Sequence, residues 1–345
     1  MKASVVVVDW KRPDLTRRCL ASLAVQDAAP FEIVLVVNEA APAFVEQVAA
    51  EHPGVVVLPE AENTGFAAAV QRGVARSGGD VVVLLNNDAV AAPDFVRQVL
   101  AALDRAPDDV AAVAPLVLLE GTFDEGGAAS DPDVLTSVDG VRWTRRADAL
   151  GASLVNSAGI GVGRDGNGAD RGWLLPVDDL DDLEGGPEPF GFSGGAAAVR
   201  RDALDDVGGF DPSLFMYYED LDVSWRLRLS GRRIVVAPAA VVVHRHAGSS
   251  SSSGQLVRYQ SMRNRLAVVV RNGSAGFVLR VVARTAARAV RDLVWPGRGQ
   301  LDAAGWRRLA RELPRLVATG VRRRRLDGRS RADRRRVEQL METRG

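Results

Sequence analysis

The chain has almost no cysteine and lacks long apolar runs. Cys19 is the only cysteine among 345 residues, so no disulfide can form within the chain, as is usual for proteins of reducing compartments. No stretch reaches the ~18 uninterrupted apolar residues that a membrane-spanning helix needs. The N-terminal run MKASVVVVDW meets charged residues too soon to be a signal-peptide core. We therefore expect a cytoplasmic protein, either soluble or bound at a membrane surface.

Net charge is also absent, since 44 basic residues balance 44 acidic ones, but the balance is uneven along the chain. Residues 276–345 hold 19 arginines against 7 acidic residues, so the body before them is acidic. One predicted helix in this tail carries arginines on one face beside apolar residues: Arg280, Arg284, Arg288 and Arg291, with Val281, Val282, Leu293 and Val294. This pattern favours an anionic membrane surface. The alternatives are a solvated helix packed on the body, or a nucleic-acid contact.

The first 120 residues alternate short Val-rich runs with helical patterns. Strands are predicted at 4–9, 31–37, 55–58 and 81–85, and helices at 15–23, 44–51, 66–76 and 95–105. Strands that are apolar throughout are buried on both faces, which predicts an α/β fold with a parallel sheet between helices. Ligands of such sheets bind beyond the carboxyl ends of the strands. That rule places Asp9, Asn38 and the Asn86-Asn87-Asp88 run at the rim.

Residues 121–190 are rich in Gly, Asp and Pro, which predicts loops, short strands and at least one mobile segment. Regular structure is expected again at 196–199 (strand), 202–207 (helix), 220–230 (helix) and 241–244 (strand), and the tail from residue 255 is predicted to be mostly helical.

Two stretches of the first half carry polar groups at strand ends. In LLNNDAV, Asp88 and Asn86 offer oxygen ligands to Mg²⁺ or Mn²⁺. The same residues would also make an ordinary strand-ending turn. In ENTGFAAAVQRGV, Asn63 and Gly65 precede a helix whose free N–H groups suit an anionic ligand, or the stretch is only a capped helix.

Two further stretches carry titratable groups. FMYYEDLDVSWRLRLSG (215–231) predicts a helix with the apolar stripe Leu221, Trp225 and Leu229. Acidic residues favour a helix start, and Asp222 can pair with Arg226, yet three carboxylates exceed what the helix start needs. One of them is suited to act as a general base. In VVVHRHAGSSSSSG, His244 ends a strand and can complete a metal shell or serve a structural role, whereas the serine run predicts a flexible lid or a solvated linker.

Six stretches in this order resemble the family 2 glycosyltransferases with the GT-A fold, particularly the bacterial rhamnosyltransferase-like branch. They are SVVVVDW, NTGFAAAVQRGV, LLNNDAV, VNSAG, GFSGGAAAVRRDALDDVGGFDPSLFMYYEDLDVSWRLRLSG and VVVHRHAGSS, between about residues 3 and 272. The resemblance implies a mostly parallel Rossmann-like sheet flanked by helices. Residues 1–120 would bind the nucleotide-sugar, 121–272 would shape the acceptor site, and 273–345 would form a basic helical extension.

The resemblance also implies roles for individual residues. Asp220 would be the base that deprotonates the acceptor hydroxyl, with Glu219 beside it. A divalent metal, Mg²⁺ or Mn²⁺, would be held by Asp88, Asn86 and His244. The donor would be framed by Asp9, Asn38, Asn63, Gly65, Asn87, Gly194 and Gly195. The acceptor pocket would be walled by Tyr217, Tyr218 and Trp225.

This interpretation predicts an inverting glycosyltransferase. Only one base motif is visible in the sequence, and a single base suits a direct displacement at the anomeric carbon. Its partners would be a UDP- or dTDP-linked sugar, with rhamnose preferred, and a lipid-linked or cell-envelope glycan at the inner face of the membrane. No nucleic acid is expected. Two departures bear on the donor: Asn38 follows Val37 where the family often has Asp-Asn, and Asn86 replaces the first Asp of the DxD element. A nucleotidylyltransferase shares the sheet and rim metal, but WKRPDLTRR lacks the glycine-rich loop it would need.

Overall fold

The computed structural model describes residues 1–28, 30–128, 131, 134–148, 150–181, 186–245, 254–295, 297 and 300–341. Its first part alternates strands and helices as predicted. The strands are β1 (Ala3–Asp9), β2 (Glu32–Val37), β3 (Val55–Pro59) and β4 (Val81–Asn86). The helices are α1 (Pro13–Ala24), α2 (Pro42–Glu51), α3 (Phe66–Arg76) and α4 (Phe95–Arg105). Each predicted element of this region is confirmed within a few residues.

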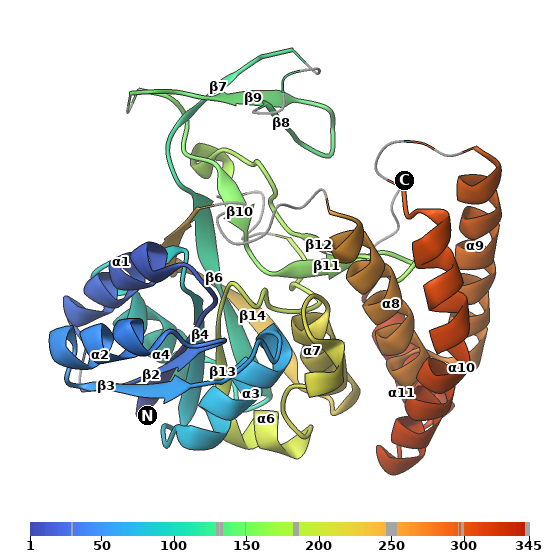
Figure 1. The fold of residues 1–345 in the computed structure, drawn as a ribbon, viewed down its shortest axis with the longest axis horizontal. Coiled ribbons are helices and arrows are strands. Elements are labelled where there is room, and N and C mark those ends of the chain that lie inside the picture. Colours follow the sequence, from blue (N-terminus) through green and yellow to red (C-terminus); the bar gives the residue numbers. More distant parts are fainter. Residues whose placement is uncertain are drawn as a thin grey trace.

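The central sheet joins this first part to the second (Figure 1). The added strands are β5 (Ala89–Ala91), β6 (Val110–Leu119), β10 (Val155–Ser157), β13 (Ala196–Arg200) and β14 (Arg233–His244). The strand order is β3-β2-β1-β4-β13-β6-β14-β5, and β10 pairs with β6. The predicted parallel arrangement holds for β3-β2-β1-β4 and for β6 with β14. In contrast, β13 runs antiparallel between β4 and β6.

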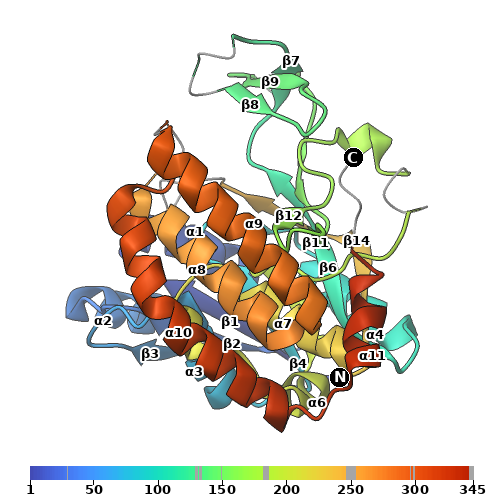
Figure 2. The same ribbon diagram turned by 90° about the vertical axis from the view of Figure 1, so that its right-hand side faces the viewer.

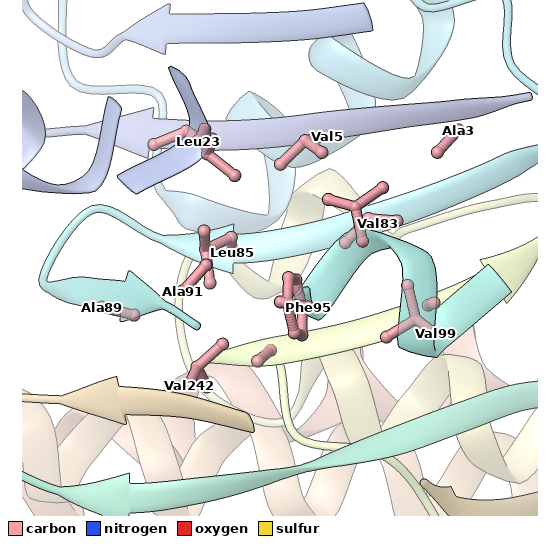
Figure 3. Packing of buried hydrophobic residues seen from close by; sticks show 14 of the residues in the cluster. Ala3, Val5, Leu23, Val83, Leu85, Ala89, Ala91, Phe95, Val99 and Val242 are labelled. Carbon is pink, nitrogen blue, oxygen red and sulfur yellow. The ribbon is translucent and has the colours of Figure 1, made fainter. Parts of the chain in front are cut away.

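Both faces of the sheet are covered by helices. One hydrophobic core lies between the sheet and helices α1, α2 and α4; Figure 3 shows Val5, Leu85 and Phe95 packed in it. A second core lies between the sheet, α3, α6 (Arg201–Asp206) and α7 (Glu219–Leu229). Burying one such Val, Leu or Phe side chain contributes about 1.5–3 kcal/mol. The two cores therefore fix the strand ends, and with them the polar residues of the rim.

The region that was predicted as loops and short strands consists of small antiparallel pieces. β7 (Phe123–Glu125), β8 (Val134–Thr136) and β9 (Arg142–Arg145) form a three-stranded sheet that projects from the body (Figure 1). β11 (Ile160–Val162) and β12 (Gly168–Asp170) form a hairpin. Gly168 lies against Leu221, so this hairpin packs beside the start of α7.

The C-terminal region forms a helical layer. It contains α8 (Gln255–Asn272), α9 (Ala275–Val294), α10 (Ala303–Leu326) and α11 (Arg331–Glu338). Figure 2 shows α8, α9 and α10 side by side, and α11 packs against α7. Over the residues that the structure describes, no helix is both long and apolar enough to cross a bilayer.

A buried ion cluster ties this layer to α7. The Asp222 carboxylate, 1% exposed, accepts hydrogen bonds from Arg226 of its own helix at 2.8 Å and from Arg271 of α8 at 2.7 Å. These arginines hold the pKa of Asp222 below its ordinary value despite its burial. Arg323 of α10 pairs with Asp211 in the same way. The Asp222–Arg226 pair predicted from the sequence is thus confirmed, and it anchors the C-terminal layer.

Candidate active site

Asp88 and His244 meet at the rim of the sheet. β14 pairs with β5 so that His244 lies opposite Ala89, which places the imidazole beside the preceding residue. His244 Nε2 lies 3.0 Å from Asp88 Oδ1, and the Asp88 side chain is 2% exposed. A carboxylate and an imidazole at this distance can share one divalent cation. Two residues 156 positions apart in the chain are therefore brought together as predicted.

Asn156 of β10 orients the imidazole. His244 Nδ1 lies 2.7 Å from Asn156 Oδ1, and because an amide oxygen only accepts, the Nδ1–H donates to it. With a cation bound at Asp88, Nε2 would then be the ligating nitrogen. Such a second hydrogen bond fixes the tautomer and ring orientation of metal-binding histidines. Asn156 was not predicted as a site residue. Its only sequence signal was its position in the VNSAG stretch.

The donor set fits a divalent cation that also binds phosphate. Within the described part of the chain, no group of three His, Cys, Asp or Glu side chains could enclose a metal. Mg²⁺ and Mn²⁺ sites in nucleotide enzymes commonly use one or two protein ligands, with substrate phosphates and water completing the shell. The Asn86 amide lies toward Gly195, with its nitrogen 3.7 Å from where a Cβ would stand on that glycine. A metal role for Asn86 stays a prediction.

Asp9 and Asn87 bind each other rather than standing free at the rim. Asp9 Oδ1 accepts hydrogen bonds from Thr16 Oγ1 at 2.5 Å and from Asn87 Nδ2 at 3.2 Å. Burial raises the pKa of Asp9, and these hydrogen bonds oppose the rise. The trio holds the ends of β1 and β4 against α1. A direct contact of Asp9 or Asn87 with a nucleotide stays a prediction.

Asn38 and Asn63 are also brought together. Asn38 Nδ2 donates to Asn63 Oδ1 at 2.9 Å, while Asn38 Oδ1 accepts from the backbone N–H of Thr64 at the same distance. Gly65 then begins the turn into α3 with φ of +85°, where a Cβ would stand 2.5 Å from the Phe215 ring. Only glycine fits this conformation and this contact. The loop that precedes α3 is therefore locked to the loop that precedes α7.

Gly194 and Gly195 connect the metal side of the rim with the carboxylate pair. Asn86 N–H donates to the Gly195 carbonyl at 2.9 Å, and Gly194 N–H donates to Asp220 Oδ2 at 2.8 Å. A Cβ on Gly194 would lie 3.5 Å from Glu219 Oε1. The absence of side chains at these two positions leaves the Asp220 carboxylate approachable from the rim.

Glu219 and Asp220 are neighbouring carboxylates in the first turn of α7. Burial raises the pKa of Glu219 well above its ordinary value, and the charge of Asp220 raises it further. Burial also raises the pKa of Asp220, although the N–H groups of Gly194 and Leu221 donate to its carboxylate and oppose the rise. Glu219 Oε2 has no hydrogen-bond partner among the described residues. The rise is the stronger for Glu219, whereas two backbone N–H groups favour the ionised form of Asp220, so Asp220 is the better candidate for the base.

The loop that leads into this pair is strained. Phe215, Tyr217 and Tyr218 all have positive φ values, between 61° and 70°, which side-chain-bearing residues rarely adopt. Asn264 of α8, fully buried, clamps the loop: its Nδ2 donates to the carbonyls of Leu214, Met216 and Tyr217 at 2.6–2.8 Å. Backbone strain of this kind is common in loops at functional sites, and the Asn264 amide helps to hold it here.

We expect Asn264→Ala to free the loop. Three carbonyls would lose their donor, which costs about 1–3 kcal/mol of unfolding free energy, and turnover should fall further because Asp220 follows the loop directly. Thermal unfolding and kcat measure the two effects. Gln260→Ala on the same helix is the control, since no hydrogen bond to the Gln260 side-chain oxygen occurs in the described part of the chain. Equal effects of the two changes would contradict the clamp.

The structure corrects the role of Trp225. Its side chain is 0% exposed, and its ring packs edge-on against Phe190 and Phe277, with ring centroids 5.5 and 5.9 Å away. A residue enclosed in the core cannot wall an acceptor pocket; the i, i+4 stripe that includes it is the buried face of α7. Tyr217 and Tyr218 are half-buried, and their acceptor role stays a prediction. The predicted serine-rich lid with His246 lies outside the described residues.

Asp170 is a site residue that the sequence reasoning missed. It ends β12 opposite Ile160, with Ser157, Asp220 and His244 near enough to influence its pKa. Although its surface is partly open to solvent, desolvation by the surrounding protein raises the pKa of Asp170 to about 6. Asp220 adds to the rise, and Ser157 opposes it. No sequence signal separated it from the other acidic residues of the 121–190 region.

Comparison with known proteins agrees with this geometry. The model of glycosyl transferase family 2 matches residues 4–208. An N-acetylglucosaminyl-diphospho-decaprenol L-rhamnosyltransferase of Mycobacterium tuberculosis is 28% identical over 262 residues, covering 71% of this chain and 76% of that protein. The O-antigen biosynthesis protein RfbC of Myxococcus xanthus is 24% identical over 264 residues, covering 72% of this chain and 18% of that protein.

Solved structures share the fold. A crystal structure of GalNAc-T7 with UDP, GalNAc and Mn²⁺ superposes with a TM-score of 0.58 at 16% identity, covering 90% of this chain and 54% of that one. The mannosyltransferase PcManGT from Pyrobaculum calidifontis, in complex with GDP-Man and Mn²⁺, gives 0.52 at 18% identity, covering 98% and 86%. The family model spans more than half of the chain. The chain therefore belongs to glycosyl transferase family 2.

Proposed function

We propose that the protein is an inverting, metal-dependent glycosyltransferase that moves a sugar from a nucleoside diphosphate to a hydroxyl of a lipid-linked or cell-envelope glycan. One observation carries the proposal: Gly194 and Gly195 join the Asp220 carboxylate to the rim that holds Asp88 and His244. A base and a cation site on one continuous rim are what displacement of a diphosphate by a hydroxyl requires. The M. tuberculosis relative, by its name an L-rhamnosyltransferase with a decaprenol-linked acceptor, supports this class of acceptor and rhamnose as the sugar. We propose a UDP- or dTDP-linked donor.

The reaction needs one proton transfer from the protein. The acceptor oxygen forms its bond to the anomeric carbon while the bond from that carbon to the phosphate oxygen breaks, and the nucleoside diphosphate leaves with the electron pair. Asp220 takes the hydroxyl proton. Beside it, burial and the charge of Asp220 favour the protonated form of Glu219. A divalent cation held by Asp88 and His244 would neutralise the charge of the leaving diphosphate. Attack from the face opposite the leaving group inverts the anomeric centre.

Titration of the purified protein with UDP, dTDP and GDP, each with and without Mn²⁺, tests the proposal. We expect one nucleotide to bind at least about tenfold more tightly when the metal is present, because the cation bridges phosphate and protein. The preferred nucleotide would name the donor. Absence of binding by all three, with the protein shown to be folded, would contradict the assignment of Asp88 and His244.

Asp170 is proposed to hydrogen-bond a hydroxyl of the donor sugar or the acceptor, since it lies between the base and the metal histidine. We expect Asp170→Asn to lower kcat/KM by about 10- to 100-fold, the range of one hydrogen bond to a charged group, without loss of thermal stability. Steady-state kinetics at fixed Mn²⁺ measures this. Asp165→Asn, at the turn of the same hairpin, is the control and should change little. If the two variants behave alike, Asp170 has no contact with substrate.

The C-terminal layer is proposed to hold the enzyme at the cytoplasmic face of the membrane, near a lipid-linked acceptor. Of the apolar residues expected on this helix, Leu293 and Val294 are exposed, whereas Val281 is buried in the core with Phe277. Leu279, Val290 and Trp295, which were not expected, are 71%, 62% and 69% exposed. No contact with nucleic acid is proposed.

A further inference from the structure

A cavity lined by arginines lies where three C-terminal helices converge. It has a volume of about 290 Å³ and lies between the first residue of α9, the last turns of α10 and the start of α11. Its lining residues are Ala275, Val321, Arg324, Arg325, Arg329, Arg331 and Arg334. Below, these five arginines are called the arginine pocket. The sugar-transfer chemistry uses none of them.

The floor of the arginine pocket is rigid. Arg334 is 2% exposed, and its guanidinium donates to both carboxylate oxygens of Asp327 at 2.7–2.8 Å and to the carbonyls of Arg271 and Asn272 at 2.9–3.0 Å. Arg324 donates to the Val270 carbonyl at 3.3 Å. Burial lowers the pKa of Arg324, and the charge of Arg334 lowers it further. Two cations are thus held close together, with Asp327 already engaged by one of them.

The mouth of the pocket adds further positive charge. Arg325, Arg329 and Arg331 are exposed, and none forms an ion pair with any residue in the described ranges. The carboxylate of Asp333 is engaged in the Ser330 capping box of α11. Like charges that converge on one cavity repel one another unless an anion enters. Guanidinium groups in this arrangement suit the oxygens of a phosphate, which they bind in bidentate fashion.

An exposed apolar stripe leads away from the pocket along α9. It begins at Ala275 in the pocket wall and continues at helical spacing through Leu279, Val290 and Leu293, which are 71%, 62% and 51% exposed. Leu326, at the end of α10, is 80% exposed. Arg280, Arg284 and Arg291 are exposed along the same helix. An apolar helix face bordered by arginines is the pattern of helices that lie in the headgroup region of a bilayer.

We propose that the arginine pocket binds the phosphate of an anionic membrane lipid while the α9 stripe enters the headgroup layer. The positive charge of the pocket favours a phosphate as its ligand. Because the apolar stripe begins at the pocket, a phosphate that belongs to a membrane lipid is favoured over a free ion. The proposal rests on the membrane contact proposed above, and it is separable from sugar transfer because the pocket shares no residue with the catalytic rim.

Vesicle flotation with the full chain tests the pocket. The vesicles are phosphatidylcholine alone, or phosphatidylcholine with phosphatidylglycerol. The test variant replaces Arg325, Arg329 and Arg331 with Gln. The matched variant replaces Arg307, Arg311 and Arg315, exposed arginines of α10 outside the pocket. We expect the pocket variant to lose about 100-fold in apparent affinity for anionic vesicles, roughly fivefold per arginine, and the matched variant less than about fivefold in total.

Each of the other possible outcomes would contradict one part of the proposal. Equal losses of vesicle affinity in both variants would show a general attraction of arginines to the anionic surface and would contradict a role for the arginine pocket. If the wild type bound inorganic diphosphate but not anionic vesicles, the ligand of the pocket would not be a lipid. The same would follow if an RNA oligonucleotide displaced the vesicles and lost affinity for the pocket variant only. Nucleotide titration of the same variants separates the two proposals. If it fails while vesicle binding persists, only the transferase proposal is lost; the reverse result removes only the lipid site.

Discussion

Replacing Asp220 with asparagine is expected to lower kcat by about 10²- to 10⁴-fold, the usual contribution of a positioned general base. The amide keeps the size of the carboxylate and can still accept the Gly194 N–H, but it cannot take the acceptor proton. Donor binding should persist, since the nucleotide is bound at the other end of the rim. Single-turnover kinetics together with nucleotide titration measures both quantities.

The matched change is Glu219→Gln. Because burial and the charge of Asp220 favour the neutral form of Glu219, a neutral amide is the closest substitute for it, and the loss of turnover should be clearly smaller than for Asp220→Asn. If Glu219→Gln proved the more damaging change, the roles of the two carboxylates would have to be exchanged. Thermal stability should not fall in either variant, because each removes a costly ionisable group from a buried position.

The pH dependence of the wild type follows from the same pair. A base acts when it is deprotonated, so kcat/KM must rise with pH as Asp220 ionises. Burial raises the pKa of Asp220, so this rise should lie above the pH range of an ordinary aspartate. In Asp220→Asn the acidic limb should disappear, leaving a low and flatter profile. A profile that kept its acidic limb would assign that limb to another group, with Asp170 the nearest candidate.

Local sequence patterns sufficed for the first half of the fold. β1 and β4 are continuous apolar runs that end in polar residues, so their type, burial and direction could all be predicted. The antiparallel insertion of β13 could not, because Ala196–Arg200 carries no signal for which strands it joins. Pairing across more than a hundred residues depends on tertiary packing, which short apolar strands specify poorly.

The candidate site shows the same division. Asp88, His244 and the Glu219–Asp220 pair stood in recognisable stretches, and the structure brings the first two into contact. Asn156 and Asp170 act through neighbours distant in the chain, so their own surroundings in the sequence revealed little. The predicted acceptor role of Trp225 was wrong for the opposite reason. An aromatic ring in a helical stripe is explained by core packing alone, and its buried position agrees with that simpler interpretation.

The second large effect concerns the proposed metal site. Asp88→Asn and His244→Ala are each expected to lower kcat/KM by about 10²- to 10³-fold, because each removes a ligand of the cation that stabilises the leaving diphosphate by several kcal/mol. The readout that separates this role from a structural one is the Mn²⁺ dependence of nucleotide binding. Both variants should bind the nucleotide weakly with and without the metal, and their thermal melting without metal should stay close to that of the wild type.

Asn156→Ala is a control for which an intermediate loss of metal affinity is expected. Asn156→Ala leaves both ligands in place but removes the acceptor of the His244 Nδ1–H, so the imidazole can turn and change tautomer. A loss of about 10- to 100-fold in metal affinity is expected, which added Mn²⁺ should partly restore. Asp88→Asn combined with His244→Ala should cost little more than either change alone, since the two residues act as one site. Strictly additive losses, or an Asn156→Ala variant indifferent to Mn²⁺, would mean that Asp88 and His244 are a structural pair and that the diphosphate is neutralised elsewhere.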